Sequence, residues 1–127
     1  MIEDEKRGLV ERFLAAYNAF DLDGMMALTH PDIEFRNISG GKVTAAALGA
    51  EEFRRLAEQS LGLFASRRQS ILTYRGKDEQ AFLEIAFEAV PARDLPNGMK
   101  AGETIRLNGV SEFTFRDGKI LRLVDIS

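Results

Sequence analysis

The sequence predicts an α+β fold in which N-terminal helices pack against a largely antiparallel sheet. Apolar residues recur with helical spacing in residues 5–20 and again in residues 51–64. From residue 70 onward they alternate with a period of two, and Asp117-Gly118 marks a tight hairpin turn between the last two predicted strands. Helices followed by a run of strands favour segregated α and β layers over alternating βαβ units.

Three segments are predicted to be helical. The first, residues 5–20, carries an apolar stripe made by Leu9, Phe13, Ala16, Tyr17 and Phe20. Asp4 is its expected N-cap, because a carboxylate can accept one of the free amides of the first turn. A short second helix is expected to start at Asp21 and to end at Pro31, since proline disfavours helical backbone in the residue before it. The third helix, residues 51–64, opens with two acidic residues, which are favoured at a helix N-terminus.

Five segments have the alternation of strands, and they are residues 33–38, 70–75, 81–90, 105–115 and 120–126. The polar and alanine-rich stretch after Ser39-Gly40-Gly41 is expected to be a connection that ends at Gly49. The stretch from Pro91 to Gly102 is rich in turn-forming residues and is expected to be a loop. No internal repeat, low-complexity tract or linker divides the chain, so residues 1–127 are predicted to form a single domain.

Composition excludes several classes of function. The net charge is −3 and the basic residues are dispersed, so we expect no binding to nucleic acid or to an anionic membrane surface. The chain has no cysteine, which excludes disulfides and thiolate chemistry. His30 is the only histidine, at the expected end of the short helix, where it would cap carbonyls; we expect no metal and no cofactor. The charged N-terminus lacks an apolar signal core and no segment has the roughly 20 apolar residues of a membrane span, so a cytoplasmic protein is expected.

Residues 13–35, "FLAAYNAFDLDGMMALTHPDIEF", resemble the opening of the nuclear transport factor 2-like superfamily, in its SnoaL-like and ketosteroid-isomerase-like branches. Gly49 before an acidic helix start and the closing "FTFRDGKILRLVDIS" are similar as well. The resemblance implies a cone-shaped, cystatin-like fold, in which helices close over a curved, largely antiparallel sheet around a pocket. It also implies frequent homodimerisation through the outer sheet face. This fold hosts isomerases, cyclases, epoxide hydrolases and non-catalytic modules, so the chemistry must be inferred from the site.

The catalytic set of ketosteroid isomerase does not carry over to this chain. With Asp21-Leu22-Asp23 and the last hairpin aligned, the base aspartate of that family falls on Asn37, whose amide accepts no proton at neutral pH. The oxyanion-stabilising tyrosine falls on Phe13, and its partner aspartic acid falls on Ser111. A conventional ketosteroid isomerase is therefore not expected.

Strand alternation predicts which side chains line the pocket. An inward Asn37 is matched by inward odd positions on the last two strands, and the first helix adds two aromatic side chains. The predicted ligand-binding residues are Phe13, Tyr17, Asn37, Leu107, Ser111, Phe113 and Leu123. Such a wall suits a small hydrophobic ligand held by a few hydrogen bonds. Tyr17 is either a packing residue with its hydroxyl near solvent or a donor at the rim of the pocket. Asn37 either orients a ligand or satisfies backbone groups where its strand ends.

Asp125 is the candidate catalytic residue, because a carboxylate in the apolar segment "ILRLVDIS" is costly to bury unless it is paired or protonated. The resemblance to SnoaL-like cyclases and epoxide hydrolases implies a general acid or base at this place. The other interpretation is a structural carboxylate bonded to Asn37, Ser111 or an arginine. Arg67-Arg68 is expected to be a solvated start to a strand and not an anion site.

Two classes of function follow from these alternatives. One is an isomerase, cyclase or hydrolase in which Asp125 moves a proton on a small hydrophobic ligand. The other is a non-catalytic ligand-binding or dimeric accessory domain. They differ in the surroundings of Asp125: an open apolar cavity without a cation should raise its pKa, whereas a filled hydrogen-bonded site would make it structural.

Overall fold

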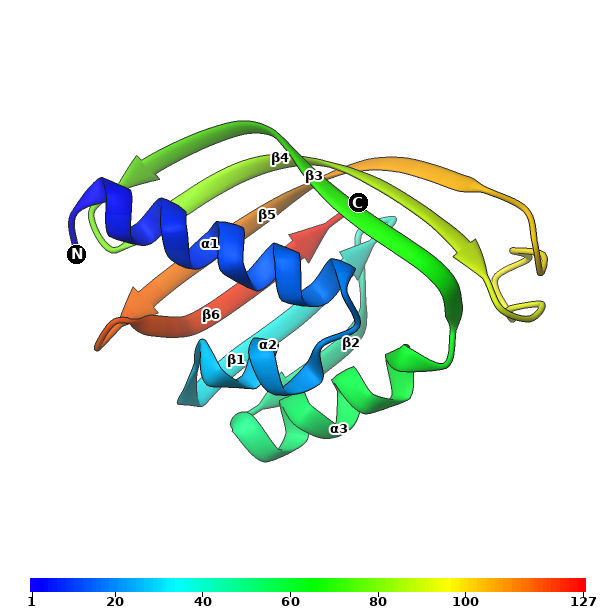
Figure 1. Cartoon of the computed structure of the whole chain (residues 1–127), viewed down its shortest axis with the longest axis horizontal. Coiled ribbons are helices and arrows are strands. Elements are labelled where there is room, and N and C mark those ends of the chain that lie inside the picture. The colour runs from blue at the N-terminus through cyan, green and yellow to red at the C-terminus, as the bar shows by residue number, and fades with distance from the viewer.

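Three helices and six strands make up the fold, and the computed structural model describes all residues 1–127 (Figure 1). The helices are α1 (Glu3–Asn18), α2 (Leu22–Ala27) and α3 (Ala50–Leu61). The strands are β1 (Thr29–Ser39), β2 (Lys42–Leu48), β3 (Phe64–Lys77), β4 (Gln80–Pro91), β5 (Ile105–Arg116) and β6 (Lys119–Ile126). The predicted α+β class is confirmed.

All six strands belong to one sheet, in the order β2-β1-β6-β5-β4-β3. Only β1 and β6 are parallel; every other neighbouring pair is antiparallel. The predicted Asp117-Gly118 hairpin joins β5 to β6, and both residues have positive φ, 54° and 73°. The sheet curves around α1, with β3 and β4 arching over it in Figure 1.

The core lies between the helices and the concave face of this sheet. α1 packs against β3, whereas α3 covers β1 and β2 at the other end. Phe13 of α1 meets Phe113 of β5 edge to face, with ring centroids 6.1 Å apart. The cone that the resemblance implied is therefore present. None of the helices has both the length and the apolar character needed to cross a membrane.

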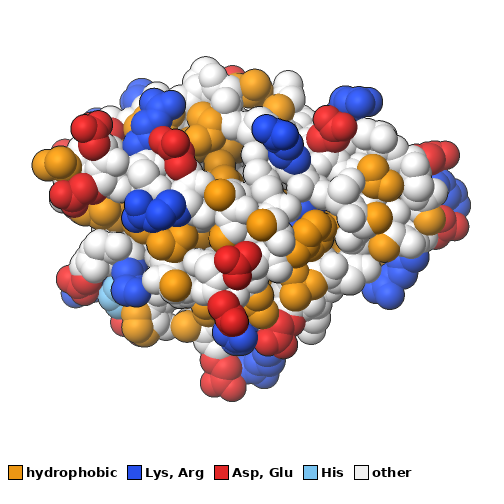
Figure 2. Space-filling view, viewed as in Figure 1, with side chains coloured by type: hydrophobic (Ala, Val, Ile, Leu, Met, Phe, Trp, Pro, Cys, Tyr) orange, Lys and Arg blue, Asp and Glu red, His pale blue; other side chains and the backbone are white.

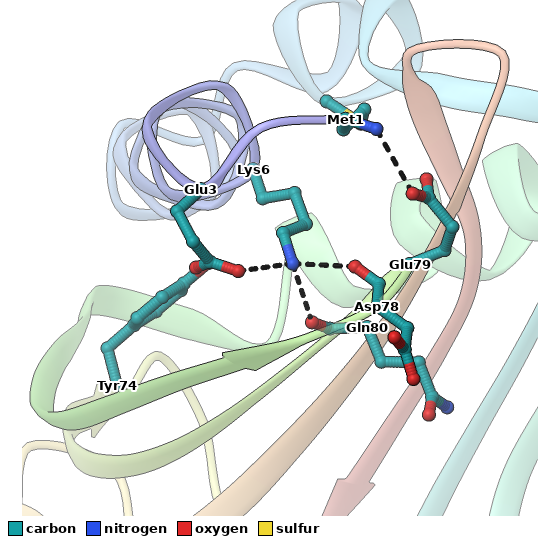
Figure 3. A network of polar contacts seen from close by, with 7 residues as sticks. All are labelled: Met1, Glu3, Lys6, Tyr74, Asp78, Glu79 and Gln80. Carbon is teal, nitrogen blue, oxygen red and sulfur yellow. Dashed lines mark hydrogen bonds and ion pairs between the residues drawn. The ribbon is translucent and has the colours of Figure 1, made fainter.

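The start of α1 differs from the prediction, because Asp4 is not its N-cap. The N-cap position belongs to Ile2, and no side chain caps the helix there. A network of polar contacts holds this end instead (Figure 3). The buried Lys6 ammonium forms an ion pair with Glu3 and donates to the carbonyl oxygen of Asp78 at 2.6 Å, in the turn between β3 and β4. The first turn of α1 is thereby tied to that hairpin.

The short second helix ends before Pro31, at Ala27, and the following strand is longer than predicted. β1 begins at Thr29, so Pro31 lies inside it. The register of β1 with β6 is interrupted between Thr29 and Glu34, and proline, which has no N–H to donate, fits that unpaired stretch.

Two further boundaries were wrong. The expected connection before Gly49 contains the edge strand β2, which pairs antiparallel with β1. The predicted third helix extends too far, since α3 ends at Leu61 and Phe64 already begins β3. In β2, pairing with β1 decides the backbone against local propensity, because alanine and lysine are poor strand formers. At the end of α3, Gly62 is the C-cap and Phe64, a good strand former, pairs with β4.

Candidate functional site

A cavity of about 620 Å³ opens between the helices and the concave face of the sheet, and 19 of its 30 lining residues are hydrophobic. All eight residues selected from the sequence line it, namely Phe13, Tyr17, Asn37, Leu107, Ser111, Phe113, Leu123 and Asp125. Phe113 and Leu123 are almost fully buried, whereas Leu107 is 43% exposed. The wall is thus apolar, with a few polar groups directed into it.

Asp125 is the acidic residue of this cavity, and its surroundings oppose its charge. It stands on β6 directly opposite Ser111 of β5, whose hydroxyl donates to Asp125 Oδ1 at 2.7 Å. No arginine, lysine or histidine forms an ion pair with this carboxylate. Burial raises the pKa of Asp125 to about 6, and the hydrogen bond from Ser111 opposes that rise.

Asn37 lies beside Asp125 across the parallel strand pair but does not hydrogen-bond to it. Its amide nitrogen donates to Thr44 Oγ1 of β2 at 2.8 Å, and the Thr44 hydroxyl donates in turn to the Asn37 carbonyl oxygen at 3.3 Å. Asn37 therefore ties β1 to the edge strand while one side of it faces the cavity. Of the three partners considered for Asp125, the structure provides Ser111 alone.

Tyr17 is partly buried, packs against the core and lines the cavity, which favours the second of the two alternatives for this residue. Burial raises the pKa of Tyr17 above its usual value, and the negative charge of Asp125 raises it further. The Arg67 guanidinium and the Gln69 side chain act in the opposite direction. Tyr17 is thus a protonated phenol on the wall of the cavity, with the Arg67 guanidinium stacked on its ring.

Arg67 is the residue that the sequence interpretation missed. It is 5% exposed, whereas its neighbour Arg68 is exposed, so the two arginines are not a solvated pair. Arg67 Nε donates to the backbone oxygen of Tyr17 at 2.9 Å, and its guanidinium carbon lies 3.8 Å from the centroid of the Tyr17 ring. The signal was present in strand parity: with β3 starting at Phe64, Arg67 shares the inward face with Gln69.

His30 lies on β1 and does not cap the short helix. Its Nδ1 accepts a hydrogen bond from the Asp32 amide at 3.0 Å, and its Nε2 is 3.4 Å from Asp117 Oδ2. It is not among the residues that line the cavity. No three His, Cys, Asp or Glu side chains are grouped so as to hold a metal ion.

Comparison with known proteins identifies the family. Residues 10–123 match the family model of the SnoaL-like domain. Because this match covers most of the 127 residues, the chain belongs to the SnoaL-like domain family. No curated protein matches the chain in sequence.

Solved structures share this fold over nearly the whole chain. A candidate polyketide cyclase from Xanthomonas campestris is 22% identical, with a TM-score of 0.78 and coverage of 98% of this chain and 90% of its own. An epoxide hydrolase from M. tuberculosis is 18% identical, with a TM-score of 0.77 and coverage of 97% and 82%. TerC, co-crystallised with polyporic acid, is 21% identical, with a TM-score of 0.76 and coverage of 96% and 90%. At these identities the likeness shows the fold.

Proposed function

We propose that this protein is a small-molecule enzyme, an isomerase, cyclase or hydrolase, in which Asp125 is the acid–base group. The observation that carries the proposal is an Asp125 carboxylate that lines an apolar cavity, has no cationic partner and has a pKa raised to about 6. A general base works best when its pKa lies near the working pH. The fold shared with a candidate polyketide cyclase and an epoxide hydrolase supports these classes of reaction.

The geometry supports a proton transfer from the ligand to Asp125. Ser111 occupies Oδ1 of the carboxylate, and no other side chain hydrogen-bonds to it, so Oδ2 faces no competing donor. In the ionised form, Asp125 Oδ2 accepts a proton from one of two sources. One is an acidic C–H of the ligand, and the other is a water molecule that attacks the ligand. The negative charge that then develops on a ligand oxygen is stabilised by the Tyr17 phenol as hydrogen-bond donor. Return of the proton from Asp125 completes an isomerisation or a ring closure. On the water route, the water oxygen bonds to an epoxide carbon as the C–O bond of the ring breaks, and Asp125 then returns the proton to the resulting alkoxide.

The shape and lining of the cavity define the class of ligand. A volume of about 620 Å³ with mainly hydrophobic walls suits a small organic molecule whose body is apolar. The polar groups gather at Tyr17, Ser111 and Asp125, which suits one oxygen-bearing end. The complex of TerC with polyporic acid supports an organic ligand within a fold of this kind.

A non-catalytic ligand-binding domain is the second candidate function. The hydrogen bond of 2.7 Å between Ser111 and Asp125 favours it, because it holds the carboxylate in place across two strands. In that case the cavity binds a ligand without changing it, and Asp125 serves to orient the ligand.

Replacing Asp125 by asparagine tests the two functions against each other. The Asp125→Asn variant keeps the shape of the side chain and removes its basicity. Screened on enolisable ketones and epoxides of suitable size, the wild type should turn over at least one class. The variant should lose roughly 100-fold or more in kcat while still binding the ligand.

The matched control is Asp32→Asn, an exposed carboxylate outside the cavity, which should leave kcat unchanged. Turnover by Asp125→Asn at the wild-type rate would remove Asp125 from the mechanism. Ligand binding without turnover in the wild type would favour the binding domain.

A further inference from the structure

The chain buries two cationic side chains, and the structure treats them differently. Lys6 is 2% exposed and has an anionic partner in Glu3, besides the carbonyl oxygen of Asp78. Arg67 is 5% exposed and forms no ion pair with any carboxylate. A guanidinium stays charged at any physiological pH, and a buried charge without a counter-charge is costly. The charge of Lys6 is thus balanced by a carboxylate within the chain, whereas the charge of Arg67 is not.

The contacts of Arg67 place its charge directly behind the wall of the cavity. Its Nη1 donates to Ser60 Oγ at 3.4 Å and its Nε donates to the Tyr17 backbone oxygen at 2.9 Å. Its guanidinium also stacks over the Tyr17 ring, 3.8 Å from the centroid, and lies 4.5 Å from the ring centroid of Phe20. Tyr17 and Ser60 both line the cavity, as does Gln69, two residues further along β3.

These partners are all neutral, so they satisfy hydrogen bonds without balancing the positive charge. Asp125 is the acidic residue that lines the cavity, and it is not paired with Arg67. Tyr17 lines the same cavity as Asp125, and the Arg67 guanidinium stacks on its ring. An anionic oxygen bound at Tyr17 would therefore meet a hydrogen-bond donor with a fixed cation behind it.

We propose that the cavity selects ligands with an anionic oxygen, a carboxylate or an enolate or phenolate, at the wall formed by Tyr17, Ser60 and Gln69. Arg67 is a positioning residue in this arrangement. It acts through Tyr17, whose ring it holds in place, and it supplies the charge that favours the anion. The inference deepens the proposed function by naming the substrate class, and it uses the cavity as a ligand site without requiring catalysis by Asp125.

Binding of matched acids and amides tests this selectivity. 2-Naphthoate and 2-naphthamide have nearly the same shape and differ in charge at neutral pH. Isothermal titration calorimetry of the wild type should give about tenfold tighter binding of the acid, which corresponds to about 1.4 kcal/mol. In Arg67→Met the acid and the amide should bind with about equal affinity. Arg67→Lys should restore part of the preference for the acid, because lysine supplies a positive charge but lacks the planar guanidinium that stacks on Tyr17.

Three further arms separate the sources of the effect. 4-Nitrophenolate compared with 4-nitroanisole tests a phenolate or enolate oxygen, so the two pairs show which kind of anion the wall favours. Arg68→Met, the exposed neighbour on the opposite face of β3, should keep the wild-type preference for acid over amide. Asp125→Asn removes a negative charge from the same cavity, so the preference for acid over amide should be at least as large as in the wild type, whatever happens to turnover. Failure of the catalytic proposal is therefore distinguishable from failure of this one.

Two results would overturn the inference. One is equal affinity of the wild type for the charged and neutral members of both pairs, which needs no variant. The other is an unchanged preference in an Arg67→Met protein whose circular dichroism matches the wild type. Where Arg67→Met does not fold, the wild-type ratios and Arg67→Lys decide, since a merely structural arginine gives no preference for the anion.

Discussion

At the scale of single residues, the Asp125 carboxylate is held in a place that favours its neutral form. Burial raises its pKa from an ordinary 3.8 to about 6. Such a difference between folded and unfolded chains corresponds to about 3 kcal/mol of folding free energy, because each pKa unit is worth about 1.4 kcal/mol. The folded protein binds the proton more tightly than the unfolded chain does. Asp125 therefore supports folding while it is protonated and opposes it once ionised.

This linkage predicts how stability depends on pH. The contribution of Asp125 is fully present below about pH 4 and is lost as the pH rises through about 6. Asp125→Asn abolishes this dependence, so at pH 8 the variant should be more stable than the wild type, by up to about 3 kcal/mol. Urea denaturation of both proteins at pH 5 and pH 8 measures the difference. Equal stability at pH 8 would mean that the ionised carboxylate is not destabilised by its surroundings.

Ser111 sets how far the pKa of Asp125 rises. Its hydroxyl donates to the ionised carboxylate at 2.7 Å and so favours the charged form. In Ser111→Ala the pKa of Asp125 should therefore move above about 6, as should the lower limb of any pH–rate profile. Carboxyl titration by NMR measures it, with the exposed Ser66→Ala as the control. An unchanged pKa would assign the hydrogen bond a packing role only.

The polar residues of the site were predictable to different degrees. Asp125 stood out in sequence because a charge interrupts an apolar strand. Its pairing with Ser111 depends on a register shift between Thr114 and Phe115, which the Asp117-Gly118 turn alone does not define. Arg67 lies where α3 gives way to β3, and its parity depends on where that strand starts. That boundary is decided by pairing with β4, which no local pattern records. A misplaced boundary thus concealed a buried charge.

At the scale of elements, the sequence predicted the long and strongly periodic segments correctly, but it did not predict the edge strand β2. α1 and β4 have apolar stripes that bury one face, so their local pattern and their packing agree. β2 is an edge strand whose alanines pair with β1 in a register that shifts after Asn37. Its backbone hydrogen bonds are made to β1, a partner that the sequence of β2 alone does not reveal. Sequence reasoning that treats each segment alone therefore leaves such a strand as a connection.

The anchoring of α1 predicts the effect of removing Lys6. Its ammonium satisfies carbonyl oxygens of the β3–β4 turn, and Figure 3 shows it directed between Glu3 and that turn. Lys6→Met keeps the apolar stem but leaves these acceptors unpaired, so the free energy of unfolding should fall by about 1–3 kcal/mol. Lys77→Met, an exposed lysine beside the same turn, should change it by less than about 0.5 kcal/mol. Equal effects of the two variants would show that the network does not anchor the helix.

At the scale of the whole molecule, the helices cover one face of the sheet and leave the other face open. An antiparallel sheet tolerates this when its outer face is polar. Here that face carries ion pairs such as Arg36 with Glu34, at 3.1 Å. Figure 2, which views the helix side, shows acidic and basic side chains interspersed with apolar ones. On the sheet, Val110 and Ile126 are 38% and 36% exposed and lie opposite each other in register on β5 and β6. They border the cavity, but because they alternate with the inward pair Ser111 and Asp125, their side chains point to the outer face.

This exposed apolar pair leads to the last prediction, a homodimer that forms through the outer face of the sheet. Two copies would cover Val110 and Ile126 against each other, with the surrounding ion pairs at the rim. Light scattering at micromolar concentration should give twice the chain mass of 14.2 kDa. Val110→Glu should return the mass to that of one chain, because it introduces a like charge at a symmetric contact. Leu48→Glu, at an apolar residue that is more exposed (66%) and lies on the edge strand β2, should leave the dimer intact. A wild-type mass of one chain at every concentration would contradict the prediction.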